Sequence, residues 1–264
     1  MTKRMTIDGS GTPRATCVLA PNVSPVTLNG TNTWIIAEPG SPSAIVVDPG
    51  PQDEGHLRRV LEMACTGGRR IAQIILTHGH RDHSAGAGRL AVMSGAPVLA
   101  ANPARRVGDA GIFDRDLITA AGCDLHVIGT PGHSWDSVSL LLPADRALLT
   151  GDTVLGRGVT AIARNGALAD YLRTLGRLRK LADQAGLQTL LPGHGPLRDD
   201  PARTVDHHIS YCQQRLDQIQ AALADGACTP AEIVAKVFVH VNPAAQRIAE
   251  SSVRAHLDYL KSTD

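Results

Sequence analysis

A dense cluster of metal-binding residue types, THGHRDHSAG at positions 77–86, constrains this chain more than any other feature. His78, His80, Asp82 and His83 lie within six positions, directly after the apolar run IAQIILT. The run predicts a buried strand, and two residues that are two positions apart in an extended segment point the same way. A lone His-x-His is usually an ordinary polar loop. The cluster alone therefore leaves both a metal site and a solvated turn open.

The same arrangement recurs further along the chain, which favours a metal site. His133 in TPGHS, Asp152 in TGDT and His194 in LPGHG each follow an apolar strand by one to a few residues. Loops at one edge of a sheet would bring all seven side chains together. Imidazole and carboxylate groups are ligands of zinc and similar divalent ions. We therefore expect a site for two divalent metal ions, with zinc favoured and manganese or iron as alternatives.

The order of apolar segments predicts an α/β fold. Short β-rich runs such as TCVLA, TWIIAE and AIVVD are separated by turn residues, and helical patterns alternate with further strands. A helix is expected over residues 84–95. Another, in ALADYLRTLGRLRKLA, has a leucine stripe that includes Leu175 and Leu178.

From about residue 203 the pattern changes to helices only. One of them, over residues 229–241, has Thr229 as its expected N-cap and Pro230 at its first helical position. We therefore expect two parts, a first domain over residues 1–202 and a helical segment over residues 203–264.

Four short motifs, THGHRDH, TPGHS, TGDT and LPGHG, make the chain resemble the metallo-β-lactamase-fold hydrolases. The resemblance covers roughly residues 15–200, and within this range GTNTWII and VDPGP also look like early strands of that family. It implies a four-layer αβ/βα sandwich with its metals at one sheet edge, so that residues 1–202 would be the catalytic domain. The tail, with EIVAKVF and SSVRAHLDYL, is similar to the small winged-helix-like segment of the β-lactamase-like protein 2 subfamily.

The same resemblance implies a role for each candidate ligand. Asp152 would bridge the two metals, and Asp48 would support the ligand loop from behind, although a simple turn residue at a strand end is the alternative for Asp48. The first metal would be held by His78, His80 and His133, and the second by Asp82, His83 and His194.

Two such ions would share a water molecule and lower its pKa, which gives a bridging hydroxide that acts as the nucleophile. Asp82 would then be a ligand alone, the interpretation we favour, or would also accept a proton as a catalytic residue. Arg157 in LGRGVT is either a contact for an anionic substrate group or a solvated loop residue. Tyr171 in DYLRTL lines the cleft or is a core aromatic.

Several substrates fit a dinuclear hydrolase. Resemblance to β-lactamase-like protein 2 implies a single-strand RNA endonuclease, and the alternative is a thioester or ester hydrolase like hydroxyacylglutathione hydrolase. A true β-lactamase is disfavoured because many of these have a cysteine where Asp152 stands. About forty residues separate Asp152 from His194, which leaves no room for the inserted domain of the large RNA-processing members.

Composition excludes some partners. The net charge is +1, which gives no global field for nucleic acid or a membrane surface. No apolar run approaches the ~20 residues of a membrane span, and the N-terminus shows no signal peptide. The five widely spaced cysteines predict reduced, mostly buried thiols and, with these absences, a cytoplasmic protein without a membrane partner.

The helical end suggests a third function, a nucleic-acid-binding module. From Val205 onward there are five basic and seven acidic residues, so this part carries a net charge of −2, the wrong sign for a phosphate-binding face. We interpret these helices as a cap bordering the cleft or a homodimer contact. Only 3% of residues are aromatic, so a stacking platform for RNA is not evident either.

Overall fold

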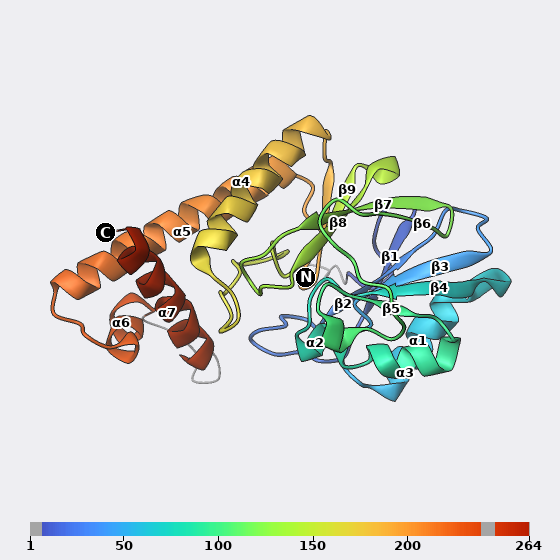
Figure 1. Ribbon diagram of the computed structural model, residues 1–264, viewed down its shortest axis with the longest axis horizontal. Helices are drawn as coiled ribbons and strands as arrows, with labels where there is room; N and C mark the ends of the chain where they lie inside the picture. Colours follow the sequence, from blue (N-terminus) through green and yellow to red (C-terminus); the bar gives the residue numbers. More distant parts are fainter. Residues whose placement is uncertain (1–6, 239–245, 264) are drawn as a thin grey trace, which may run out of the picture.

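Two five-stranded sheets face each other in the computed structural model, which describes residues 7–238 and 246–263 (Figure 1). In the first sheet β1, β2 and β3 are antiparallel neighbours, whereas β3, β4 and β5 run parallel. Every residue of β2 and β3 is buried, because one face of the sheet is covered by helices and the other by the second sheet. The strands are, in spatial order, β1 (Ala15–Leu19), β2 (Asn32–Ile36), β3 (Ser43–Val47), β4 (Arg70–Ile75) and β5 (Val98–Leu99).

The second sheet is mostly antiparallel. Only its edge pair, β10 with β9, is parallel. Side chains of both sheets meet in one continuous core, in which Ile36, Ile45, Leu125 and Leu140 are fully buried. The strands are, in spatial order, β10 (Thr189–Pro192), β9 (Ala147–Gly151), β8 (Val138–Leu142), β7 (Cys123–Gly129) and β6 (Leu117–Ala120).

Helices cover the outer faces of both sheets, which completes the predicted αβ/βα sandwich. α1 and α3 pack on the first sheet, and α4 and α5 cover the second (Figure 1). The predicted leucine stripe of α4 is confirmed, because Leu175 and Leu178 are buried against β9 and β10. The helices are α1 (Glu54–Ala64), α2 (Arg81–Ser84), α3 (Ala87–Ser94), α4 (Leu168–Gln184), α5 (Pro201–Ala224), α6 (Pro230–Val237) and α7 (Gln246–Thr263), with short 3-10 turns at Thr66–Gly68, Pro103–Arg105 and Pro143–Asp145.

The helix expected over residues 84–95 begins three residues later, at Ala87, and ends at Ser94, and a separate short helix, α2, precedes it. α2 is a single turn, and α3 begins after Gly86. A Cβ at Gly86 would lie 2.8 Å from Leu57 and 2.9 Å from the carbonyl oxygen of Pro51, so the chain passes too close to its neighbours for a larger residue there. This close approach fixes α2 at the rim of the first sheet.

The helical end is continuous with the sandwich through α5. The first half of α5 packs beneath α4 through Val205 and Cys212, whereas its second half carries Ile219 into a small core with α6 and α7. α5 thus packs both in the sandwich and in the helical end. The division into two parts at residues 202 and 203, expected from the sequence, stays a prediction.

The start of α6 follows the sequence prediction. Thr229 caps the helix, reciprocally with Glu232, and Pro230 is its first residue. The helix ends at Val237 rather than at residue 241, and residues 239–241 lie outside the described residues. Among the residues that are described, no helix combines the length and the apolar character needed to span a membrane.

Candidate metal centre

All seven predicted ligands meet at one rim of the sandwich. Each comes from a loop or turn that directly follows a strand, and together they form two groups of potential ligand atoms that lie within 4.8 Å of one another in each group. Because the strands of both sheets end at this rim, residues more than a hundred positions apart become neighbours. The ligands follow β4 (His78, His80, Asp82, His83), β7 (His133), β9 (Asp152) and β10 (His194).

The first group consists of three histidines whose ring nitrogens face one another. His80 Nδ1 lies 3.1 Å from His78 Nε2 and 3.0 Å from His133 Nε2. Nitrogens bound to one tetrahedral ion at the usual bond length would lie ~3.3 Å apart. The spacing therefore fits three ligands of one cation.

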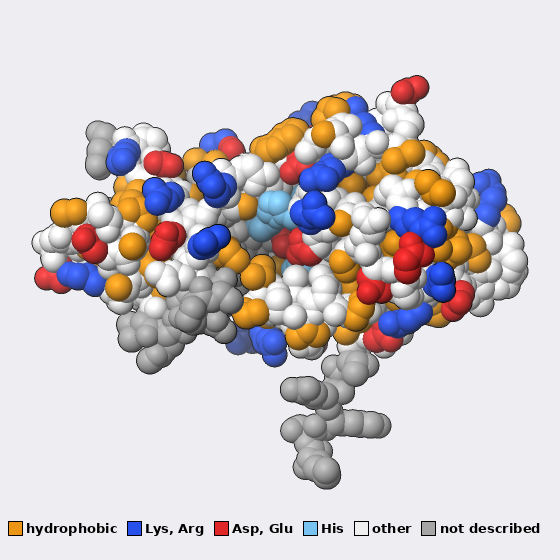
Figure 2. Space-filling model, turned by 90° about the horizontal axis from the view of Figure 1, so that it is seen from below, with side chains coloured by type: hydrophobic (Ala, Val, Ile, Leu, Met, Phe, Trp, Pro, Cys, Tyr) orange, Lys and Arg blue, Asp and Glu red, His pale blue; other side chains and the backbone are white. Residues whose placement is uncertain are grey.

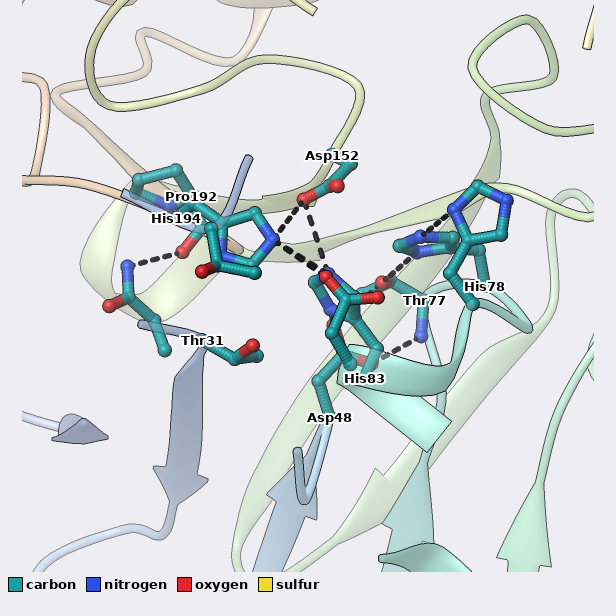
Figure 3. A network of polar contacts seen from close by, with 12 residues as sticks. Thr31, Asp48, Thr77, His78, His83, Asp152, Pro192 and His194 are labelled. Atoms are coloured by element: carbon teal, nitrogen blue, oxygen red, sulfur yellow. Dashed lines mark hydrogen bonds and ion pairs between the residues drawn. The ribbon is translucent and has the colours of Figure 1, made fainter. Parts of the chain in front are cut away.

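The second group combines two histidines with two carboxylates. His194 Nε2 lies 3.1 Å from His83 Nε2 and 3.2 Å from Asp82 Oδ2. Asp152 Oδ1 lies 3.3 Å from His83 Nε2, within the same cluster. Figure 3 shows Asp152, His83 and His194 pointing toward one another.

Asp152 lies between the two groups and presents one oxygen to each. Its Oδ1 faces the second group, 3.5 Å from His194 Nε2, and its Oδ2 is 3.7 Å from His133 Nε2 in the first. Oδ1 is buried and has no hydrogen-bond partner among the described residues. A buried carboxylate oxygen without a partner is costly, and a cation on each side of Asp152 would remove that cost.

The outer nitrogens of the five imidazoles explain why the inner ones are free to bind. Each outer nitrogen faces an oxygen, so it carries the proton and leaves a lone pair on the inner nitrogen. Inner lone pairs directed at one another are unfavourable unless metal ions or protons lie between them, so both groups fit metal ions. The acceptors are Thr77 Oγ1 for His78 (3.1 Å), Asn165 Oδ1 for His80 (3.4 Å), Asp48 Oδ2 for His83 (2.9 Å), the Ala161 oxygen for His133 (2.7 Å) and the Gly30 oxygen for His194 (3.1 Å).

Asp48 contacts the loop that carries the candidate ligands, and its support of a metal centre stays a prediction. Besides His83, its carboxylate accepts hydrogen bonds from the backbone N–H of Thr77 at 2.8 Å and from the Thr77 hydroxyl at 2.7 Å. Because that hydroxyl donates to Asp48, its oxygen can accept from His78. The Thr77 side chain thus links both groups, a role that its place in THGHRDH does not reveal.

Burial and charge act differently on the two groups. Burial lowers the pKa of His78 and of His133, which keeps both rings neutral. Burial also opposes protonation of His194, but Asp152 and Asp82 outweigh it and raise its pKa to about 9. The second group therefore has a negative potential, which attracts a cation.

Four of the candidate ligands line a cavity of about 540 Å³. His80, Asp82, His133 and Asp152 line it. The predicted substrate contact Arg157 also lines it, together with Arg164 and Arg247, which sequence analysis missed.

Tyr171, the other candidate substrate contact, is buried away from the cavity. Its hydroxyl donates to the Thr153 carbonyl oxygen at 2.8 Å and lies 3.0 Å from His208 Nδ1. It is 1% exposed, which favours the core interpretation. Tyr171 thus contacts the backbone of Thr153, the residue that follows Asp152, and helps to hold that loop in place.

Comparison with known proteins is consistent with this geometry. Residues 26–194 match the Metallo-beta-lactamase superfamily. An atrochrysone carboxyl ACP thioesterase from Aspergillus fumigatus is 29% identical over 86% of this chain and 74% of its own. A beta-lactamase-like protein 2 homolog from Caenorhabditis elegans is 29% identical over 89% of this chain and 79% of its own.

Solved structures show the same fold. A beta-lactamase domain protein from Burkholderia ambifaria has a TM-score of 0.81 at 21% identity, covering 95% of this chain and 86% of its own. A metallo-beta-lactamase family protein from Thermus thermophilus has a TM-score of 0.79 at 22% identity, covering 95% and 94%. The chain belongs to the metallo-β-lactamase superfamily and is a hydrolase of it, with His and Asp groups able to hold metal ions.

Proposed function

We propose that the two ligand groups hold two divalent cations and that the protein uses them to hydrolyse a thioester or ester. The donor set of five imidazoles and two carboxylates suits zinc, with manganese and iron as alternatives. When bound, the two ions would activate a water molecule and polarise the scissile carbonyl group. In the overall reaction water supplies the new C–O bond, the C–S or C–O bond to the leaving group breaks, and a carboxylate, a thiol or alcohol and one proton are released.

The residues of the chain have distinct roles in this proposal. Asp152 would position both cations through its two oxygens, and Asp48 would hold His83 in the tautomer that binds. Asp82 is half-buried and lines the cavity, so its carboxylate would lie beside a bound substrate. We assign it as a ligand, and proton acceptance as well is the alternative role.

The observation that carries the substrate class is the character of the cavity walls. Above the ligands they consist mainly of aliphatic side chains, including Leu28, Leu155, Ile162 and Ile248. Such walls stabilise an apolar acyl group by removing it from water, at roughly 25 cal/mol per Å² of apolar surface. One relative of this chain is named a thioesterase, which supports the same class.

Single-strand RNA cleavage is the second candidate. Three arginines on the cavity could contact phosphates, and one relative carries the beta-lactamase-like protein 2 name. Against it, none of the described residues that line the cavity is Phe, Tyr or Trp. Bases would therefore find no aromatic ring to stack on. We propose the thioester or ester reaction and keep RNA as an outcome of the test.

A substrate screen tests the proposal. Purified protein would be stripped with a chelator, reloaded with zinc, manganese or iron, and its metal content measured by mass spectrometry. The reloaded protein would be given an acyl-N-acetylcysteamine thioester, a single-stranded RNA and a chromogenic β-lactam. We expect up to two equivalents of metal and cleavage of the thioester alone. Cleavage of RNA alone would replace the proposed function with the second candidate.

A matched pair of variants separates the metal centre from general damage. His80→Ala should lower thioester hydrolysis more than about 100-fold, because losing even a supporting partner of a ligand costs about 10–100-fold. His126→Ala removes an exposed histidine on β7 and should leave the rate unchanged. Equal rates for the two variants would contradict the proposal.

Location and assembly stay predictions. The five cysteines have free thiols, three of them buried, which is compatible with the reducing cytoplasm expected from the sequence. A homodimer through the helical end is expected as the alternative to a cap. Light scattering at several protein concentrations would measure the assembly directly.

A further inference from the structure

The cavity above the ligands has a charged side that the proposed reaction does not explain. Arg157 and Arg164 lie on the loop that follows β9, and Arg247 lies in the first turn of α7. These positions, up to ninety residues apart, line one cavity because α7 packs beside the loop, with Ser251 Oγ 3.4 Å from the Ile162 carbonyl oxygen. The helical end is thus part of the site.

In the part of the chain that the structure describes, no residue pairs with any of the three guanidinium groups. All three residues are exposed, and within residues 7–238 and 246–263 none makes a hydrogen bond or an ion pair with its side chain. Some other exposed arginines are paired, such as Arg89 with Glu54 and Arg177 with Asp114. The side of the cavity that carries these three arginines is therefore positively charged, and no described acidic side chain pairs with them.

The negative groups of the cavity do not neutralise them. Asp82 and Asp152 are the acidic residues among its described lining residues, and both belong to the ligand groups. Figure 2 shows histidine at the centre of this face, with Lys and Arg side chains and hydrophobic side chains around it. Arginine binds carboxylate and phosphate oxygens through paired hydrogen bonds. Free arginines beside an aliphatic chamber therefore fit a ligand that is apolar at one end and anionic at the other.

We propose that Arg157, Arg164 and Arg247 form an anion-recognition site for the substrate. The substrate would be an acyl thioester whose apolar acyl group packs against the aliphatic walls and whose anionic oxygens contact the arginines. These oxygens belong either to phosphates on the thiol side or to a carboxylate on the acyl side. The inference rests on the proposed thioester reaction and adds a recognition element to it.

Three thioesters with acyl chains of equal length test the inference on metal-loaded, full-length protein. Octanoyl-N-acetylcysteamine is neutral, octanoyl-coenzyme A carries phosphates on the thiol side, and the mono-N-acetylcysteamine thioester of suberic acid carries a carboxylate on the acyl side. We expect kcat/KM to be at least about tenfold higher for one anionic thioester than for the neutral one, mainly through a lower KM. The preferred compound identifies which end of the substrate is anionic. Equal values for all three would overturn the inference.

Variants assign the preference to the arginines. Arg157→Ala, Arg164→Ala and Arg247→Ala should each lower the ratio of kcat/KM for the anionic thioester to that for the neutral one, by up to about tenfold. In the triple variant the two values of kcat/KM should be equal. Arg247→Lys should lose part of the ratio, because lysine keeps the charge but not the paired hydrogen bonds. Arg58→Ala, which removes an exposed arginine on α1, is the control and should keep the ratio. A ratio that survives the triple variant would overturn the inference.

Binding to metal-free protein separates this inference from the proposed function. Calorimetry with the same three thioesters measures affinity without hydrolysis, and circular dichroism checks that each variant is folded. If the metal-loaded protein hydrolyses none of the thioesters, the proposed function fails. If the metal-free wild type and the metal-free triple variant bind the anionic thioesters with equal affinity, the anion site is overturned.

Discussion

Asp48 Oδ2 accepts a hydrogen bond from His83 Nδ1 at 2.9 Å, and both side chains are buried. This contact places the proton on Nδ1 and directs the lone pair of His83 Nε2 to the second ligand group. Asp48 itself has a φ of 52°, in the left-handed region. Its position therefore suits Asp or Asn, which adopt that conformation more readily than other residues with a side chain.

The first prediction replaces Asp48 with Asn. The oxygen that accepts from the Thr77 N–H must stay an oxygen, so the amide NH2 would face His83 and the Thr77 hydroxyl. One N–H of this group would then oppose the proton on His83 Nδ1 and favour the tautomer that cannot bind through Nε2. We expect Asp48→Asn to lower metal affinity about 10–100-fold, measured by competition with a chromophoric chelator. Asp109→Asn, an exposed aspartate, is the control, and equal affinities for the two variants would refute the supporting role.

The second prediction concerns Gly193, which precedes the ligand His194. A Cβ there would lie 2.7 Å from both Asp152 Oδ1 and His83 Cε1, closer than real Cβ contacts. Gly193→Ala should therefore displace ligands of the second group and reduce the metal content at equilibrium. It should also cost about 1–3 kcal/mol of unfolding free energy through overpacking.

Gly88→Ala is the matched control for Gly193→Ala. Gly88 lies in α3, and a Cβ there would meet nothing within 4 Å. Gly88 is the second residue of α3, where the preference for alanine over glycine is weaker than the roughly 0.5–1 kcal/mol of a helix interior. This variant should therefore be at least as stable as the wild type and keep its metal. Mass spectrometry and urea denaturation measure both effects. Full metal content in Gly193→Ala would show that the second group tolerates the extra carbon.

The residues that come together as candidate ligands could be predicted from the sequence because their signal is local. An apolar strand, a glycine or proline and a His or Asp within a few positions define each of them, as at His133 and His194. The fold class follows from the same strands and from the α4 stripe. The ends of α2 and α3 could not be predicted, because the close approach at Gly86 depends on residues from α1.

The arginines that line the cavity could not be predicted as a group from the sequence. Arg164 and Arg247 are separated by more than eighty residues, and neither lies in a motif. They line one cavity only because α7 packs beside the loop after β9, a tertiary contact that no local pattern encodes. Tyr171 remained ambiguous for the same reason, since a helix residue faces the core or a cleft according to what packs on it.

The third prediction uses the hydroxyl of Tyr171. It donates to the buried Thr153 carbonyl oxygen and faces His208 Nδ1, which in turn can donate to it. Tyr171→Phe leaves His208 Nδ1 without its partner in the core, and leaves the Thr153 carbonyl oxygen with the longer hydrogen bond from the Thr160 hydroxyl at 3.2 Å. This loss should cost about 1–3 kcal/mol in urea denaturation. Tyr211→Phe removes a hydroxyl that accepts a hydrogen bond from Arg215 at a half-buried position, where water can replace it. This variant should cost less than about 1 kcal/mol. Equal losses would mean that water or a rearrangement replaces the Tyr171 contacts.

The last prediction concerns the pH dependence of stability. Burial, with smaller effects from His207 and Arg198, lowers the pKa of His208 to about 4. The unfolded chain has an ordinary histidine pKa near 6.5, so between these values it binds more protons than the folded chain. The free energy of unfolding therefore falls as the pH drops from 6.5 toward 4. This one side chain should account for a loss of about 2 kcal/mol between pH 7 and pH 5.

His208→Gln tests this prediction, because glutamine can still donate to Tyr171 but does not titrate. Urea denaturation at pH 7 and pH 5, with chelator present throughout so that metal binding does not contribute, should show a pH effect about 2 kcal/mol smaller in His208→Gln than in the wild type. His126→Gln removes an exposed histidine and should keep the wild-type pH effect. A wild-type pH effect in His208→Gln as well would contradict the prediction, because it would mean that the folded protein accepts the proton at His208 without penalty. Water would then have to reach His208 Nε2, which has no hydrogen-bond partner among the described residues.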